Sequence, residues 1–199
     1  MTSSNPASSS TSRAEIITIL DRSGSMFSIK KDIIGSFNSF LTDQGSLPGE
    51  AKVTLIQFDD KIETVYQGVP IKDVAPLTNE TFVPRGTTSL YDAIGTALSV
   101  QGERIKREAW ADVVIVTILT DGAENSSTEY TAERVKEMTS HAETHGWKFI
   151  YLGANQDSFS VSRGLGIVGG TTVNFDASSL GVTQAYATMS ATTRSYRGG

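Results

Sequence analysis

Three short segments carry oxygen side chains in a pattern that suits a divalent cation. The first, Asp21-Arg22-Ser23-Gly24-Ser25, offers one carboxylate and two hydroxyls at positions i, i+2 and i+4. The other two are Gly86-Thr87-Thr88 and Thr120-Asp121-Gly122. Hard divalent cations bind carboxylate, hydroxyl and water oxygens. Each segment alone is an ordinary turn or helix cap, so its position in the fold decides what it can do.

Asp21 and Asp121 each stand at the end of a predicted buried strand. Residues 14–21 are apolar on both faces, and residues 112–119 are almost entirely β-branched or aliphatic. Both patterns are typical of central strands in a parallel sheet. If the two strands are adjacent, their carboxyl ends share one edge, where ligand sites of open α/β sheets gather. Thr87 precedes a predicted helix, so its hydroxyl can approach the same edge.

Strand and helix patterns alternate along the rest of the chain. Apolar residues recur at helical spacing in 29–41, 90–105, 132–142, 157–165 and 182–189. Further strands are predicted over 51–58, 61–66, 147–152 and 171–175. The Asp59-Asp60 pair predicts a hairpin turn, which makes one edge strand antiparallel. The expected fold is therefore a doubly wound, Rossmann-like α/β domain. It has a mostly parallel six-stranded central sheet, one antiparallel edge strand and helices on both faces.

Composition narrows the class of protein further. With 199 residues, 38% of them hydrophobic, the chain fits one domain over residues 14–199, and residues 1–13 are predicted to be a disordered Ser/Thr-rich tail. The absence of cysteine excludes disulfides, thiolate catalysis and cysteine-ligated zinc. A net charge of −5 argues against nucleic acid, and the short basic run at 104–107 is expected to be a solvated helix end.

No signal peptide and no apolar stretch of membrane-spanning length is evident in the sequence. We therefore expect no membrane partner and a cytoplasmic location, with association with a virion as the alternative.

At this point the pattern resembles the von Willebrand factor A (vWA) domain family. The metal-ion-dependent adhesion site (MIDAS) of that family consists of Asp-x-Ser-x-Ser, then a Thr, then an Asp. The matching residues here are Asp21, Ser23, Ser25, Thr87 and Asp121. The resemblance covers nearly the whole chain. Two further segments are similar to small stand-alone bacterial and phage members, namely Leu90-Tyr91-Asp92-Ala93-Ile94 and Tyr151-Leu152-Gly153-Ala154-Asn155-Gln156.

The resemblance implies a role for each site residue. Ser23 and Ser25 would bind the metal directly, Thr87 directly or through water, and Asp21 and Asp121 largely through bound waters. Mg²⁺ or Mn²⁺ is the expected ion, with Ca²⁺ as an alternative. Neutral hydroxyl ligands leave the charge of the cation incompletely compensated, so it would accept an Asp or Glu carboxylate from a partner protein.

Three functions follow from this site. The leading hypothesis is a metal-dependent protein-binding (adhesion or scaffolding) module that is not an enzyme. The second is a structural component of a virion or bacterial complex, in which the metal only stabilises the fold. The third is a phosphatase of the haloacid dehalogenase type, which needs a second acid two residues after its aspartate. Ser23 occupies that position, so the acid that would serve as the general acid/base is missing there. The oligomeric state is left open.

Two other motifs are weaker. His141 and His145 are spaced i, i+4 as in helical zinc sites. However, no glutamate stands directly after the first histidine, and Gly146 predicts a helix end. The glycines of 164–169 match a dinucleotide pattern but follow a helix instead of a strand, so they predict a turn.

Four residues near the expected site have an undecided or minor role. Asp59 and Glu124 are expected to be solvated loop residues, with an acidic rim of the site as the alternative. Phe27 and Tyr91 either flank the metal or pack in the core.

Overall fold

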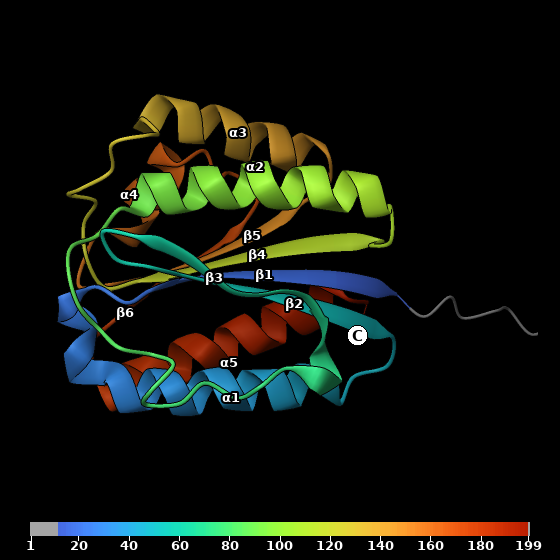
Figure 1. Ribbon diagram of the computed structural model, residues 1–199, viewed down its shortest axis with the longest axis horizontal. Coiled ribbons are helices and arrows are strands. Elements are labelled where there is room, and N and C mark those ends of the chain that lie inside the picture. Colours follow the sequence, from blue (N-terminus) through green and yellow to red (C-terminus); the bar gives the residue numbers. More distant parts are fainter. Residues whose placement is uncertain (1–11, 199) are drawn as a thin grey trace, which may run out of the picture.

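A six-stranded sheet forms the centre of the computed structural model, which describes residues 12–198, and helices cover both of its faces (Figure 1). Five strands are parallel, and β3 runs antiparallel to β2 at one edge. This confirms the predicted doubly wound α/β fold with one antiparallel edge strand. In the order in which they lie in the sheet, the strands are β3 (Ile62–Pro70), β2 (Glu50–Phe58), β1 (Arg13–Asp21), β4 (Val113–Thr120), β5 (Lys148–Ala154) and β6 (Thr171–Phe175).

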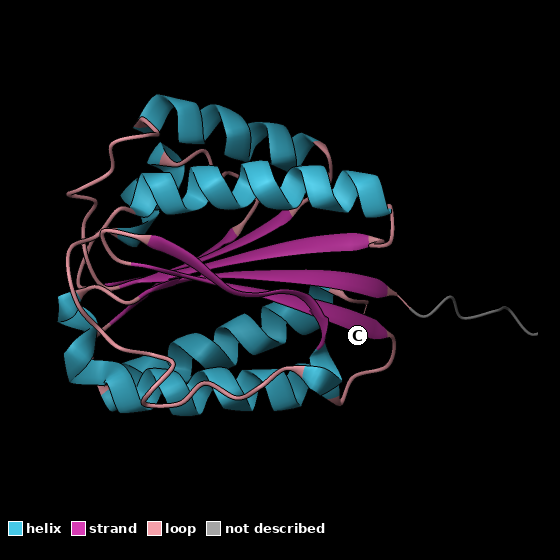
Figure 2. Ribbon diagram, in the orientation of Figure 1, coloured by secondary structure: helices cyan, strands magenta, loops and turns pink. Residues whose placement is uncertain are grey.

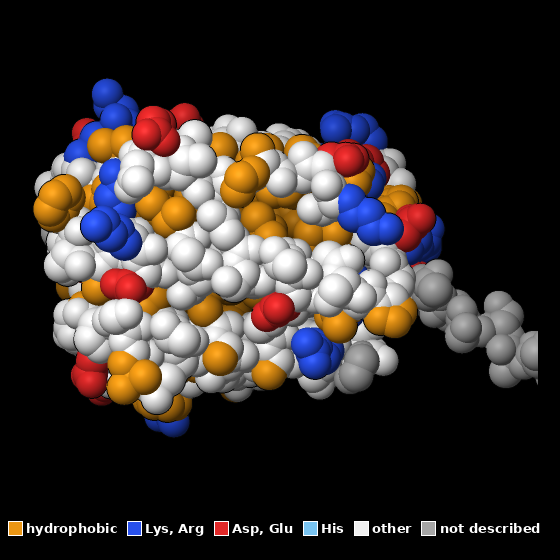
Figure 3. Space-filling view, turned by 90° about the horizontal axis from the view of Figure 1, so that it is seen from below, with side chains coloured by type: hydrophobic (Ala, Val, Ile, Leu, Met, Phe, Trp, Pro, Cys, Tyr) orange, Lys and Arg blue, Asp and Glu red, His pale blue; other side chains and the backbone are white. Residues whose placement is uncertain are grey.

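The helices form two layers (Figure 2). Side chains alternate along a strand, so Ile16 and Leu20 of β1 enter one core cluster while Ile17 and Ile19 enter the other. On one face lie α1 (Lys30–Gly45) and α5 (Ser179–Tyr196), and on the other lie α2 (Leu90–Glu108), α3 (Ala132–Thr144) and α4 (Ser158–Gly164). Seen from the side of α1 and α5, uncharged side chains dominate the surface (Figure 3).

Several element boundaries differ from the sequence-based expectation. The edge strand β3 continues to Pro70 instead of ending at residue 66. A proline is tolerated there because an edge strand has no ladder partner on its outer side. A 3₁₀ helix, η1 (Gly24–Ile29), precedes α1, and another, η2 (Ile71–Asp73), follows β3. The predicted tail at residues 1–13 lies outside the described residues except for its last two, and Arg13 begins β1.

Within residues 12–198, no helix is both long enough and apolar enough to cross a membrane.

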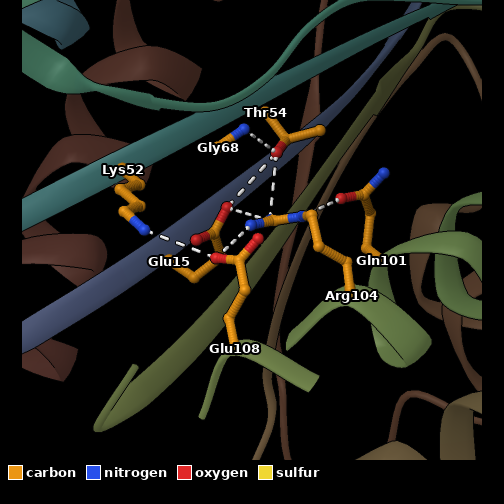
Figure 4. A network of polar contacts seen from close by, with 7 residues as sticks. All are labelled: Glu15, Lys52, Thr54, Gly68, Gln101, Arg104 and Glu108. Carbon is orange, nitrogen blue, oxygen red and sulfur yellow. Dashed lines mark hydrogen bonds and ion pairs between the residues drawn. The ribbon is translucent and has the colours of Figure 1, made fainter. Parts of the chain in front are cut away.

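A buried ion pair joins α2 to the sheet (Figure 4). Arg104 of α2 donates from Nη2 to Oε1 of Glu15 on β1, and the two residues are 5% and 1% exposed. Thr54 donates to the same carboxylate, and Gln101 accepts from Arg104 Nε at 2.8 Å. The expectation of a solvated helix end was therefore wrong for Arg104. Its counter-charge lies 89 residues away in sequence, where no local pattern reveals it.

We expect Glu15→Gln to lower the free energy of unfolding by about 3 kcal/mol, because it leaves a buried guanidinium short of a counter-charge. Urea denaturation monitored by circular dichroism measures this change. The matched control is Glu137→Gln, which breaks the exposed Arg134–Glu137 pair and should cost less than about 1 kcal/mol. Equal losses in the two variants would contradict a special role for the buried pair.

Candidate metal centre

The two site aspartates lie at the carboxyl ends of neighbouring strands. Asp21 is the last residue of β1, and Asp121 directly follows β4. β1 and β4 pair in parallel, with Leu20 opposite Leu119. The adjacency that the sequence argument required is therefore present, and both carboxylates lie at the same edge of the sheet.

Hydrogen bonds bring four of the predicted residues together. The hydroxyl oxygens of Ser23 and Ser25 lie 3.1 Å apart, and Ser25 Oγ donates to Asp121 Oδ1 at 2.6 Å. Asp21 accepts from the backbone N–H of Ser23 at Oδ1 and from the hydroxyl of Thr120 at Oδ2, both at 2.6 Å. Asp21 thus fixes the loop that presents the two serines, and Thr120 fixes Asp21.

These oxygens suit a hard divalent cation. Neighbouring ligands of an octahedral Mg²⁺ lie roughly 3 Å apart, because each Mg–O distance is about 2.1 Å. The two spacings along Ser23, Ser25 and Asp121 are close to that value. Residues 12–198 contain no cluster of three or more His, Cys, Asp or Glu side chains that could hold a metal. Any metal at this edge therefore depends on the hydroxyls.

Both aspartates are buried without a basic side chain beside them among residues 12–198. Asp21 is fully buried and Asp121 is 9% exposed. Burial, together with the charge of Asp121, raises the pKa of Asp21 to about 6, and burial also raises the pKa of Asp121. Among the described side chains, no lysine, arginine or histidine lies within ion-pair distance of either carboxylate. A divalent cation would supply the missing positive charge.

The Thr88 hydroxyl lies near that of Ser25, whereas the sequence pattern predicted Thr87 as the ligand. Thr87 is exposed, and its side chain makes no hydrogen bond within residues 12–198. Thr88 is 3% exposed, and its backbone exchanges hydrogen bonds with Asn125 at 2.9 and 3.0 Å. A Cβ atom on Gly122 would lie 3.3 Å from the Thr88 hydroxyl oxygen and 3.9 Å from that of Ser25. The structure therefore brings Thr88, and not Thr87, to the other four residues.

The buried carboxylate of Asp59 holds the loops around these aspartates together. Asp59 is fully buried and accepts at Oδ2 from the Nε atoms of Arg22 and Arg85, both at 2.9 Å. Burial opposes its ionisation, but the N–H of Lys61 and the two guanidinium groups lower its pKa overall. Arg85 N–H also donates to the carbonyl of Arg22 at 2.7 Å. The expectation that Asp59 is solvated was wrong, because its partners come from two distant loops.

Two more carboxylates anchor the loop that follows Asp121. Glu124 accepts from the backbone N–H of Ser127 at 2.7 Å and from that of Tyr91 at 3.0 Å, so it braces this loop against the start of α2. Asp92 accepts three backbone N–H groups of the same loop, at 2.7 to 2.9 Å. This bracing gives a physical role to Asp92, for which the sequence offered none.

The remaining predicted residues fall into different environments. Phe27 is 73% exposed on η1, so it lies at the surface next to the site, while Tyr91 packs against the core cluster beneath α2. Tyr151 is fully buried, and its hydroxyl accepts from Gln156 at 3.1 Å. A Cβ atom on Gly153 would lie 2.9 Å from the Tyr151 ring, which explains the glycine in this segment.

The two weaker motifs are not joined to the site. The rings of His141 and His145 lie 4.3 Å apart, and Nδ1 of His145 is hydrogen-bonded to the carbonyl of His141. The glycines of 164–169 lie between α4 and β6, in the turn that the sequence predicted.

Comparison with known proteins places this fold among vWA domains. No family model matches the sequence, and no curated protein matches it. The vWF domain of the type V pili tip protein Mfa5 from Porphyromonas gingivalis superposes with a TM-score of 0.66 at 11% identity, over 92% of this chain and 96% of that one. The zinc-occupied MIDAS structure of proximal thread matrix protein 1 from the mussel byssus gives a TM-score of 0.64 at 14% identity, over 92% and 46% of the two chains.

A third similar structure is VWA2 of Sulfolobus acidocaldarius, with a TM-score of 0.56 at 21% identity, over 88% of this chain. The present chain spans less than half the length of the mussel and Sulfolobus proteins. The chain thus has the fold of a von Willebrand factor A domain.

The pH dependence of stability tests the burial of Asp21. Because folding raises its pKa from 3.8 to about 6, the contribution of Asp21 to stability is fully present below about pH 4 and is lost as the pH rises through about 6. Asp21→Asn removes this titration. In EDTA we expect the wild type to lose up to about 3 kcal/mol relative to the variant between about pH 4 and 7, measured by urea unfolding. A stability difference that is constant with pH would contradict the raised pKa.

Proposed function

We propose that this chain is a metal-dependent protein-binding module. Asp21, Ser23, Ser25, Thr88 and Asp121 would hold a divalent cation, Mg²⁺ or Mn²⁺, at the carboxyl edge of the sheet. The bound cation would supply an electrophilic position for an Asp or Glu carboxylate of a partner protein. The observation that carries the proposal is the run of short contacts from the Ser23 hydroxyl to the Ser25 hydroxyl and on to Asp121. It lies next to the buried Asp21, which has no basic partner within residues 12–198.

The roles of the individual side chains follow from their contacts. Both oxygens of Asp21 are already hydrogen-bonded, one to the Ser23 N–H and one to the Thr120 hydroxyl, so this residue would orient ligands and bound waters. The same engagement, together with a serine at i+2, disfavours the phosphatase hypothesis, in which this aspartate must be a free nucleophile. The occupied MIDAS of the mussel protein supports a divalent metal in this fold without indicating which ion this chain selects.

Matched threonine variants test the ligand set. We expect Thr88→Val to weaken Mg²⁺ binding at least about 10-fold in isothermal titration calorimetry, because it removes one ligand oxygen and keeps the side-chain volume. Thr87→Val should leave the affinity within about 2-fold, since the Thr87 side chain is exposed. A loss confined to Thr87→Val would restore the original assignment, and the absence of binding to wild type would remove the site.

A capture experiment separates adhesion from a structural role of the metal. Immobilised wild-type protein should retain a partner from host lysate in Mg²⁺ and release it in EDTA, and Asp121→Ala should retain none. Thr87→Val is the control, because it should behave as wild type. If Mg²⁺ raises the melting temperature but capture is identical in EDTA, the metal only stabilises the fold. Hydrolysis of an aryl phosphate that Asp21→Ala abolishes would contradict the non-enzymatic role.

A further inference from the structure

Three arginines are almost completely buried, and one of them lacks a counter-charge. Arg22 pairs with Asp59 and Glu63, and Arg104 pairs with Glu15 and Glu108. Arg197 is 6% exposed, and within residues 12–198 no carboxylate lies within ion-pair distance of it. Burying a charge without a partner generally costs several kcal/mol. Arg22 and Arg104 avoid this cost because each pairs with carboxylates.

The protein compensates Arg197 only in part. Its Nη1 donates to the backbone carbonyl of Gln44 at 2.6 Å and to the side-chain oxygen of Gln44 at 3.3 Å. Gln44 lies in the last turn of α1, where unpaired carbonyls carry a partial negative charge. The Nε atom of Arg197 has no hydrogen-bond partner among residues 12–198, and burial lowers the pKa of the guanidinium. A guanidinium carries five N–H donors, so capacity for an acceptor is left over.

A cavity lies beside Arg197, at the opposite end of the sheet from the proposed metal centre. Its volume is about 260 Å³, and Arg197 is part of its lining. The start of β2 contributes Lys52, η2 contributes Lys72, and the loop before β4 contributes Trp110. Lys52 Nζ lies 4.4 Å from the centre of the Trp110 ring. Glu50 is the single acidic residue in this lining, and Lys52 pairs with Glu108 at 3.4 Å. Among the described residues of the lining, Arg197 and Lys72 therefore carry the positive charge that no ion pair offsets.

We propose that this cavity binds a small oxyanion, a carboxylate or a phosphate, through Arg197 and Lys72. The planar guanidinium fork matches both kinds of anion, and a lysine at the mouth adds a second positive charge. The volume lies below the roughly 300–1,000 Å³ of pockets for drug-sized ligands, so the ligand is a small molecule or a single charged group. This site uses none of the metal-binding residues and does not depend on the proposed function.

Trp110 provides the signal for a direct test. Trp147→Phe leaves Trp110 as the single tryptophan, and its emission is followed in full-length protein during titration with sodium phosphate or sodium malonate. Sodium chloride at matched ionic strength corrects for screening. We expect a saturable change with at least one of the two oxyanions and none with chloride. The oxyanion that saturates identifies the ligand as phosphate-like or carboxylate-like.

Charge variants locate the binding site. Lys72→Glu and Arg197→Gln should each weaken the oxyanion about 10-fold or more. Lys31→Glu, an equal charge change at an exposed position of α1 outside this cavity, should leave the affinity unchanged. Lys72 is exposed, so its variant gives a result even if Arg197→Gln fails to fold. The absence of a saturable response in the parent protein would overturn the proposal, and so would an affinity that Lys72→Glu leaves unaltered.

Discussion

Two carboxylates that are buried side by side, without a basic partner in the described part of the chain, form the constraint on which this structure depends. Asp21 and Asp121 end neighbouring central strands, and burial raises the pKa of both. Folding places them there at an energetic cost that no arginine or lysine offsets. The surrounding hydroxyls and N–H groups hold the carboxylates in place but leave their charge uncompensated. The cation proposed for this site would offset that charge.

The other carboxylates near this edge have the opposite character. Asp59 is matched by two guanidinium groups, and Asp92 by three backbone N–H groups. These fully satisfied carboxylates connect the loops after β1, before α2 and after β4. The acids that support the loops thus differ from those proposed to bind the cation. The number of hydrogen bonds that each acid accepts distinguishes the two groups. Within residues 12–198, Asp59 and Asp92 each accept three hydrogen bonds and act as braces. Asp21 accepts two and Asp121 one, and these two acids are the candidates for binding.

The sequence predicted the strands, the helices and four of the five residues that make up the proposed site, because these depend on local periodicity and on which residues follow a strand. It pointed to Thr87 where the proposed site contains Thr88, since both threonines precede the same helix and differ only in the direction that the loop gives each side chain. It also missed the burial of Asp59 and Arg104, whose partners lie 26 to 89 residues away. Charge pairs of that separation leave no periodic signal, so only the three-dimensional arrangement reveals them.

The pairing of β1 with β4 also determines when the metal centre forms during folding. Asp21 and its partner Thr120 are 99 residues apart, and the chain between them includes α1, the β2–β3 hairpin and α2. Contacts of such long sequence separation pay a large loop-closure entropy and form late in folding. The serine loop alone lacks Asp121 and Thr88, so a nascent chain that ends before β4 has only part of the ligand set. Cation binding at the proposed site would therefore act on the finished fold: it would slow the loss of the native state and give little help to the early steps that build it.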